Sequence, residues 1–243
     1  GECDVETFRT HLQREPVATH QDPVVDLQQE GVGARADPHL GRAVDGIALP
    51  PFEPGAHLTV RAPDGSLRRY SLCNDPQESD RYEIAVKRDA QGRGGSIAMT
   101  DRLTVGARLP VAPPENEFAL HPRARRFLFI AGGIGITPIM AMMRHLLATG
   151  GPRFDLHYCT RSIAHTAFAA ELAAPAFASQ VHLHHDEGDP ARAFDFWPLL
   201  ERPSGAHIYC CGPRALMDAV RERVLDDIRR TGKGTTVVVL DLA

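Results

Sequence analysis

The sequence lacks long hydrophobic runs, an excess of basic residues and a secretory leader pattern. No apolar stretch approaches the roughly 18 residues that a membrane-spanning helix needs. The formal net charge of −4 is unlike the basic balance that is typical of nucleic-acid-binding proteins. The chain starts at Gly1, without the basic and then apolar residues of a signal peptide. These absences predict a protein that binds neither membranes nor nucleic acids.

Cysteines are few and are not spaced for metal binding or for disulfides. None of the five cysteines has a partner at zinc-site spacing, and Cys210 and Cys211 are adjacent, which disfavours a disulfide between them. Cys159 and Cys210 fall in apolar runs, where a free thiol behaves as a small hydrophobic group. The pattern predicts a reduced, cytoplasmic protein.

The chain is long enough for two modest domains. Its 243 residues are 43% hydrophobic and 24% charged, a balance with which each domain can bury its own core. We expect the boundary near residues 121–125, which gives a first domain over 1–122 and a second over 123–243. Residues 1–50 show little regular alternation and stay unassigned.

The second half alternates predicted strands and helices. Strands are predicted at residues 126–131, 154–159, 180–185, 207–211 and 235–240. Helices are predicted from Pro138, over residues 166–172, around Phe194–Trp197 and along Leu216, Val220 and Val224. Such alternation predicts a doubly wound parallel sheet with helices on both faces.

The first half has short strand candidates without helices between most of them. They span residues 57–61, 69–72, 81–87 and 107–112, and turn residues such as Pro63-Asp64-Gly65 separate some of them. This pattern favours a small antiparallel barrel.

Two segments of the first half can hold a flavin. Arg68 can neutralise a phosphate, Tyr70 can cover an apolar ring, and Ser71 can donate a hydrogen bond. In residues 92–96, the glycines let backbone amides approach an anion, Arg93 adds charge, and Ser96 can cap a helix and donate to the phosphate. The alternatives are that Tyr70 only packs and that residues 92–96 are a turn.

Two segments of the second half can hold a pyridine nucleotide. Gly132, Gly133 and Gly135 follow a predicted strand and precede a helix, so their backbone can approach a pyrophosphate. Cys211-Gly212-Pro213 ends another strand of the same sheet, and ligands of such sheets bind at the carboxyl ends of the strands. We therefore interpret Cys211 as a contact that positions the ligand rather than as a nucleophile.

The residues after the second strand leave the choice of nucleotide open. An acid here would favour NADH by accepting a hydrogen bond from the ribose 2′-hydroxyl. Thr160 and Arg161 occupy this place instead, and Arg161 could receive the 2′-phosphate of NADPH. Nearby, His182 and His184 share one strand face while His185 lies on the other, and we expect no metal site there.

These motifs together resemble the phthalate dioxygenase reductase family of the ferredoxin–NADP reductase superfamily. The resemblance covers roughly residues 50–225. It rests on residues 68–76, 84–89, 92–96, 132–138, 184–186, 193–197 and 209–213.

The resemblance implies FMN, NADH and an iron–sulfur acceptor. It implies that FMN is bordered by Arg68, Tyr70, Ser71, Ala85, Val86, Lys87, Arg93, Gly94, Gly95 and Ser96. From the loops described above and from the resemblance, we expect the nucleotide to be bordered by Gly132, Gly133, Gly135, Thr137, Pro138, Thr160, Arg161, Cys211, Gly212 and Pro213. Of these residues, we expect Ser71, Thr137 and Cys211 to contact the reacting groups.

The family's [2Fe–2S] domain needs a C-x4-C-x2-C run and a fourth cysteine, which this sequence does not contain. The predicted function is hydride transfer from NADH to FMN, followed by single-electron transfer to a separate ferredoxin or to the oxygenase component of a Rieske-type system. The alternatives are a stand-alone reductase with a diffusible acceptor and a non-catalytic nucleotide-binding subunit.

Overall fold

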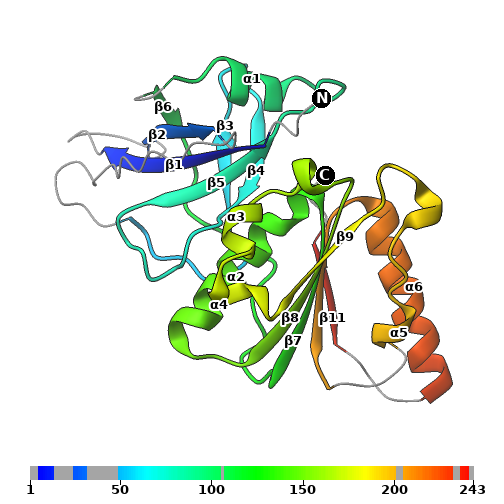
Figure 1. Cartoon of the computed structure of the whole chain (residues 1–243). Coiled ribbons are helices and arrows are strands. Elements are labelled where there is room, and N and C mark those ends of the chain that lie inside the picture. Colours follow the sequence, from blue (N-terminus) through cyan, green and yellow to red (C-terminus); the bar gives the residue numbers. More distant parts are fainter. Residues whose placement is uncertain are drawn as a thin grey trace. The chain divides into compact units, whose positions relative to one another are not determined.

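The sheets of the protein belong to two separate units of the chain. A computed structural model describes residues 5–13, 24–31, 49–104, 107–200, 205–231 and 236–240; Cys3 and Thr235 lie outside these ranges. One unit spans Asp4–Ala119 and the other Leu120–Ala243. The described strands of the first unit pair antiparallel and those of the second pair parallel, as the sequence predicts (Figure 1).

The first unit is an antiparallel barrel. Its described strands are β1 (Val5–Gln13), β2 (Val24–Gly31), β3 (His57–Arg61), β4 (Leu67–Ser71), β5 (Tyr82–Lys87) and β6 (Ala107–Pro110). Four of them form a sheet in the order β5-β1-β2-β6, and β3 pairs with β4. Bridges from Val60 to Val111 and from Leu72 to Ile84 join the pair to both edges of the sheet, which closes the barrel.

Side chains of β3 and β5 fill part of the barrel interior. Leu58 and Val60 of β3 lie with Ile84 and Val86 of β5 in one buried cluster. Met99 of helix α1 (Gly95–Asp101) belongs to the same cluster and is fully buried. The helix is therefore anchored on the barrel next to the glycines that precede it.

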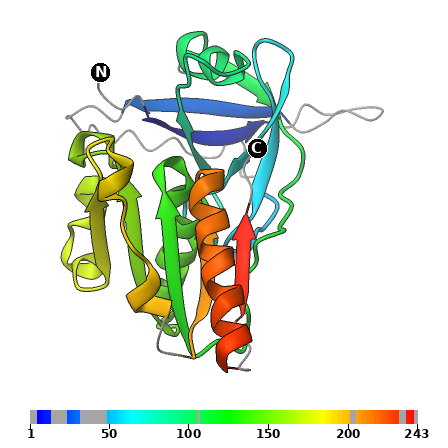
Figure 2. The same cartoon turned by 90° about the vertical axis from the view of Figure 1, so that its right-hand side faces the viewer.

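The second unit is a parallel sheet in the order β11-β10-β7-β8-β9. Its strands are β7 (Arg126–Gly132), β8 (Arg153–Thr160), β9 (Val181–His185), β10 (His207–Cys211) and β11 (Val237–Leu240). Helix α2 (Ile136–Thr149) lies on one face, and α6 (Arg214–Thr231) lies on the other (Figures 1 and 2). Met217, Val220 and Val224 of α6 pack with Ile130 and Cys210 in one buried cluster.

Three helix predictions need correction. Helix α2 begins at Ile136, so Pro138 lies inside the first turn. The helix predicted over residues 166–172 is confined to α3 (Ala169–Leu172), because Phe168 adopts a left-handed backbone with φ of 59°. A short α4 (Pro175–Ala178) follows, and α5 (Trp197–Leu200) begins only after Phe194 and Phe196.

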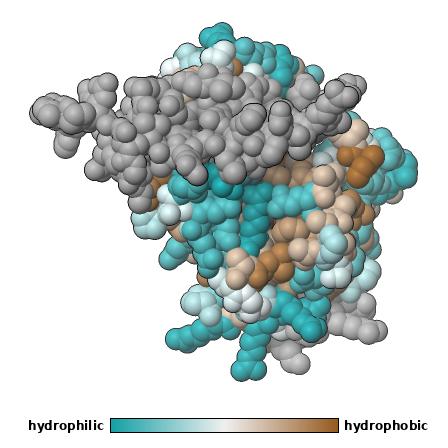
Figure 3. Space-filling view, turned by 60° about the vertical axis from the view of Figure 1, so that its left-hand side comes forward, coloured by the Kyte–Doolittle hydropathy of each residue, from teal (hydrophilic) through white to brown (hydrophobic). Residues whose placement is uncertain are grey.

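The described surface is mixed in polarity. Figure 3 shows hydrophilic and hydrophobic residues next to one another on one face. Large exposed hydrophobic side chains include Ile163 and Leu183 in the second unit and Leu67 in the first. Within the described parts of the chain, no helix combines the length and the apolar character needed to cross a bilayer.

Candidate functional site

Glycines bring the two predicted nucleotide loops of the second unit into contact. A Cβ atom on Gly135 would lie 2.3 Å from the carbonyl oxygen of Cys211. A Cβ atom on Gly212 would lie 2.9 Å from the Cα atom of Gly132. Only glycine fits these positions, so the chain after β7 and the chain after β10 meet at the carboxyl end of the sheet. This is where a doubly wound sheet binds its ligand.

Thr137 and Cys211 lie in the walls of this region and are both buried. The Thr137 hydroxyl donates a hydrogen bond to the Ile134 carbonyl at 3.0 Å, so its oxygen can still accept one from a ligand. Cys211 is fully buried at the end of β10. Pro138 is buried in the first turn of α2, and Pro213 precedes α6.

The residues at the end of β8 form a polar network. The Thr160 hydroxyl lies 2.9 Å from the Thr166 hydroxyl and 2.9 Å from Nδ1 of His185. Arg161 is exposed and its carbonyl accepts a hydrogen bond from the Glu187 backbone at 2.8 Å. The network fixes the loop where the sequence predicts the adenosine ribose, and Arg161 faces solvent beside it.

The structure also brings an acid to this loop, a position that the sequence analysis did not predict for it. Asp186 follows β9, and its backbone N–H donates to the Thr160 carbonyl at 3.3 Å. The pKa of the Cys159 thiol is raised to about 12, chiefly by burial and also by the negative charge of Asp186, so this carboxylate lies close to the end of β8. The signal was present in the sequence, since Asp186 directly follows the neighbouring strand.

The histidines of β8 and β9 form a stack of rings. The ring of His157 lies 4.7 Å from that of His182 and 5.2 Å from that of His184, between ring centres. Phe194 covers His184 at 3.5 Å. Burial, and then the charges of the other two histidines, lower the pKa of His157 to about 4. Within the described residues, no group of three or more His, Cys, Asp or Glu side chains is arranged to hold a metal ion.

In the barrel, the residues predicted to hold a flavin phosphate come together. A Cβ atom on Gly95 would lie 2.4 Å from Nε of Arg68, so the guanidinium rests against the start of α1. Gly94 has φ of 91° and caps α1, and Arg93 is exposed just before it. Ser96 therefore does not cap the helix: it lies inside the first turn, and its Oγ accepts a hydrogen bond from the Asp89 backbone at 3.1 Å. Glycine takes the cap because the left-handed conformation suits it.

The residues predicted to border the flavin ring differ in exposure. Burial raises the pKa of the Tyr70 hydroxyl to about 12. Ser71 is buried, and its Oγ has no hydrogen-bond partner within the described residues. Ala85 and Val86 are buried in β5, whereas Lys87 is exposed at its end. Buried polar groups are normally paired. The unpaired hydroxyl of Ser71, next to the half-buried Tyr70, is therefore suited to bond the polar edge of a flavin ring.

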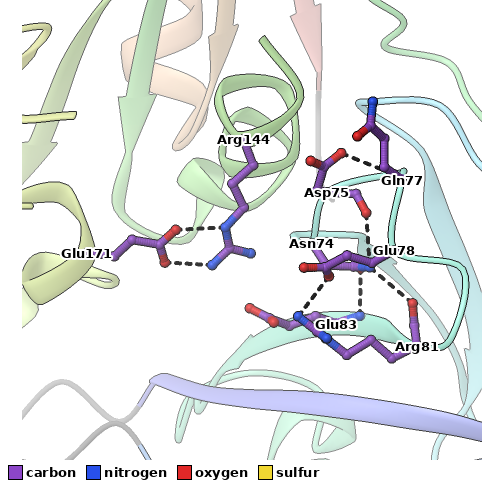
Figure 4. A network of polar contacts seen from close by, with 8 residues as sticks. All are labelled: Asn74, Asp75, Gln77, Glu78, Arg81, Glu83, Arg144 and Glu171. Carbon is purple, nitrogen blue, oxygen red and sulfur yellow. Dashed lines mark hydrogen bonds and ion pairs between the residues drawn. The ribbon is translucent and has the colours of Figure 1, made fainter. Parts of the chain in front are cut away.

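A network of polar contacts shapes the chain between β4 and β5 (Figure 4). Asn74 accepts a hydrogen bond from the Glu83 backbone at 2.9 Å and donates one to the Arg81 carbonyl at 3.0 Å. Arg81 also forms an ion pair with Glu78 at 2.8 Å. These contacts hold the segment that follows Ser71, and the sequence analysis did not predict them.

The residues present fit both groups that the resemblance implies. The fit for FMN rests on the Arg68–Gly95 contact and on the unpaired hydroxyl of Ser71. The fit for a pyridine nucleotide rests on the close approach of Gly132, Gly135 and Gly212, which leaves backbone rather than side chains at the carboxyl end of the sheet.

Comparisons with known proteins agree with this geometry. Residues 129–222 match the family model of the oxidoreductase NAD-binding domain. The chain is 60% identical to the phthalate 4,5-dioxygenase oxygenase reductase subunit of Pseudomonas putida over 176 residues, which are 72% of this chain and 54% of that protein. It is 45% identical to the vanillate O-demethylase oxidoreductase of Pseudomonas putida over 181 residues, which are 74% of this chain and 56% of that protein. The chain thus spans about half the length of the curated relatives it matches.

A solved structure extends the match to nearly the whole chain. Phthalate dioxygenase reductase, described as a modular structure for electron transfer from pyridine nucleotides to [2Fe–2S], superposes with a TM-score of 0.77. The two are 43% identical, and the match covers 96% of this chain and 67% of that one. The barrel, the parallel sheet and the motifs they carry together show that the chain belongs to the phthalate dioxygenase reductase family.

Proposed function

We propose that the chain is the FMN- and NADH-binding part of a reductase that supplies electrons to an oxygenase or demethylase. The observation that carries this proposal is the convergence of the loop at Gly132–Gly135 with Cys211–Pro213, in a chain whose barrel also carries the Arg68–Gly95 contact. FMN, when bound, accepts a hydride from NADH and releases the electrons one at a time to an iron–sulfur acceptor.

The side chains of the barrel have binding roles in this proposal. Arg68 neutralises the FMN phosphate, and the glycines before α1 leave room for that anion. Tyr70 covers the apolar ring, and the otherwise unpaired hydroxyl of Ser71 donates to its polar edge. Along β5, Ala85 and Lys87 border the same ligand, and Val86, whose side chain packs in the barrel interior, borders it with its backbone.

The side chains of the parallel sheet orient the nucleotide. The pyrophosphate is held by backbone N–H groups of the loop between β7 and α2. Thr137 accepts a hydrogen bond from the carboxamide, because its own proton is already donated to Ile134. Cys211 packs against the nicotinamide and forms no covalent bond with it. Holding the two ligands in a productive orientation is the main contribution of the protein to the rate.

Asp186 favours NADH over NADPH. The carboxylate lies beside the end of β8, where it can accept a hydrogen bond from the ribose 2′-hydroxyl, and it would repel a 2′-phosphate. Arg161 is nearby and could attract that phosphate, but it is exposed, where screening by salt weakens a charge. We therefore expect the acid to decide the preference.

The acceptor in this proposal is a plant-type [2Fe–2S] centre that lies outside these 243 residues, because the sequence contains no C-x4-C-x2-C run. The relatives are named as a phthalate 4,5-dioxygenase oxygenase reductase subunit, a phthalate dioxygenase reductase and a vanillate O-demethylase oxidoreductase. A ferredoxin domain or the oxygenase component of such a system is the expected partner.

The test is anaerobic mixing of the FMN-loaded protein with NADH and, separately, with NADPH. NADH should bleach the flavin absorbance near 450 nm within seconds, and NADPH at the same concentration should do so at least about tenfold more slowly, since one lost charge-assisted hydrogen bond is worth about that factor. A protein that takes up no FMN, or whose flavin stays oxidised with NADH, would refute the proposal.

A further inference from the structure

Tyr158 of β8 forms a hydrogen bond with the nucleotide loop, the segment Gly132–Gly135 that joins β7 to α2. Its ring is fully buried in the sheet, and its hydroxyl donates to the carbonyl oxygen of Gly133 at 2.9 Å. Gly133 is the first residue after β7 and adopts a left-handed backbone with φ of 52°. A buried side chain of the neighbouring strand thus contacts the loop at its most unusual backbone position.

The contact determines the orientation of one peptide group. The Gly133 carbonyl also accepts a hydrogen bond from the Ile136 backbone N–H, so both of its lone pairs have donors. In a trans peptide the C=O and N–H bonds point in opposite directions. The N–H of Ile134, which belongs to the same peptide group as the Gly133 carbonyl, therefore points away from Tyr158 and from the start of α2.

The space around Gly133 is open where a side chain would project. A Cβ atom added to Gly133 would meet no atom within 4 Å, whereas one added to Gly132 or Gly135 would collide with the chain after β10. Gly133, and with it one end of the fixed peptide, thus borders free space at the carboxyl end of the sheet, where an anionic ligand can approach.

We propose that Tyr158 is a positioning residue for the nucleotide, which holds the peptide between Gly133 and Ile134 with its N–H directed at the pyrophosphate. The inference rests on the proposed binding of a pyridine nucleotide and adds to it a residue that does not touch the ligand. Tyr158→Phe removes the hydroxyl and keeps the ring, so the loop loses one of two hydrogen bonds while the core stays filled.

Tyr209 provides a matched control. It lies on β10, is as fully buried as Tyr158, and its hydroxyl accepts a hydrogen bond from the His121 backbone at 2.8 Å. This contact involves a residue that precedes β7, at the other end of the strands from the glycine loop. Tyr209→Phe therefore removes an equivalent buried hydrogen bond without touching the loop.

The experiment compares the wild type, Tyr158→Phe and Tyr209→Phe as FMN-loaded proteins. NAD+ binding is measured by calorimetry, and the limiting rate of flavin reduction is measured with saturating NADH. For Tyr158→Phe we expect the Kd for NAD+ to rise about fivefold, as one hydrogen bond predicts, with the limiting rate changed less than twofold. For Tyr209→Phe both quantities should stay at the wild-type values, and both variants should keep their FMN.

Two results would overturn the role of Tyr158. One is an unchanged Kd for NAD+ in Tyr158→Phe, and the other is an equal rise in Tyr209→Phe, which would indicate a general loosening of the sheet. Calorimetry with NAD+ separates this inference from the proposed function: a wild type that binds NAD+ but is not reduced by NADH contradicts the function alone. A wild type that binds no NAD+ contradicts both.

Discussion

An added methyl group would have opposite effects at Gly133 and Gly135, two glycines of the loop between β7 and α2. At Gly135 it would overlap the backbone of Cys211, whereas at Gly133 it would project into open space. Gly135 is therefore constrained by the fold, and Gly133 by the proposed ligand that occupies the open space beside it. Single substitutions can therefore separate the structural demands of the loop from its role in binding.

Gly133→Ala should weaken NAD+ binding, and this effect should not be explained by its loss of unfolding free energy. Gly150 is a matched control, because it also has a left-handed backbone, with φ of 61°, and open space around its Cβ position. Both alanine variants should lose about 1 kcal/mol of unfolding free energy from the backbone alone. Only Gly133→Ala should raise the Kd for NAD+, by about tenfold or more, as measured by calorimetry. Equal binding by the two variants would count against a ligand at Gly133.

Arg68→Ala should weaken FMN retention. Removing the guanidinium next to Gly95 deletes a charge-assisted contact with the phosphate, which corresponds to a Kd for FMN higher by about 10- to 100-fold. Arg69→Ala is the control, since Arg69 is the next residue of β4 but is exposed and pairs with Glu117 at 3.4 Å. Fluorescence titration with FMN measures both variants, and the same affinity in both would remove the phosphate role of Arg68.

The sequence offers candidate site residues where their chemistry leaves a local signal. Glycine before a helix, arginine beside a glycine turn and proline in a first turn can be seen in the sequence, and the structure places them as groups. Tyr158 was missed, and Asp186 was noted only as part of the resemblance, because the significance of both depends on the neighbouring strand. Nothing in the residues around Tyr158 indicates that its hydroxyl reaches Gly133.

At the scale of elements, strands β8 and β9 are coupled by the stack of histidine rings. His157 and His184 share a hydrogen bond between ring nitrogens at 3.0 Å, and Phe194 covers both rings. The stack ties the segment before α5 to the sheet. The second unit thus contains two imidazoles, those of His157 and His184, whose pKa values are lowered.

Stability should fall as the pH decreases from about 6.5 towards 4. Above pH 6.5, His157 is neutral in both the folded and the unfolded chain. Below it, the unfolded chain binds a proton that the folded protein excludes, since burial lowers the folded pKa to about 4. Between pH 7.5 and 5 this one group should reduce the unfolding free energy by about 2 kcal/mol.

Denaturant unfolding at pH 7.5 and 5 checks this expectation in the wild type and in His157→Phe. The variant keeps an aromatic ring next to Phe194 but cannot titrate, so its loss of stability over the same interval should be smaller. The same loss in both proteins would mean that His157 does not bind a proton on unfolding.

The two units differ in how well their elements could be predicted. Strands of the parallel sheet are short apolar runs, and all five were located to within two residues of their observed bounds. Strands β1 and β2 were not predicted, because residues 1–50 have little alternation and both strands are defined by pairing with each other and with β5 and β6. The helix predicted over residues 166–172 is shortened because Phe168 has a left-handed backbone, which the pattern of hydrophobic residues does not reveal.

At the scale of the whole molecule, the proposed activity needs an acceptor that the 243 residues do not carry. With FMN and NADH supplied, the protein should reduce cytochrome c slowly by itself. A purified plant-type [2Fe–2S] ferredoxin domain should raise that rate by about tenfold or more, because its cluster would take single electrons from the flavin and pass them on to cytochrome c.

The control is the same ferredoxin domain with NADH and without the protein, which should show no reduction of cytochrome c. If a quinone or dioxygen takes electrons from the protein as fast as the ferredoxin-supported reaction, the stand-alone reductase becomes the better interpretation. A chain that binds NAD+ and FMN but reduces none of these acceptors would be a non-catalytic nucleotide-binding subunit.

The contact between Gly132, Gly135 and Gly212 also limits how this protein can diverge. A larger residue at Gly135 or Gly212 would collide with the backbone of the other loop, and one at Gly132 would collide with Leu216 and Pro213, so each substitution needs a shift of the chain after β7 or after β10. Changes in cofactor preference are free to accumulate elsewhere, and the turn that carries Asp186 is not enclosed in this way. Descendants with altered coenzyme use should therefore differ after β9 while retaining all three glycines.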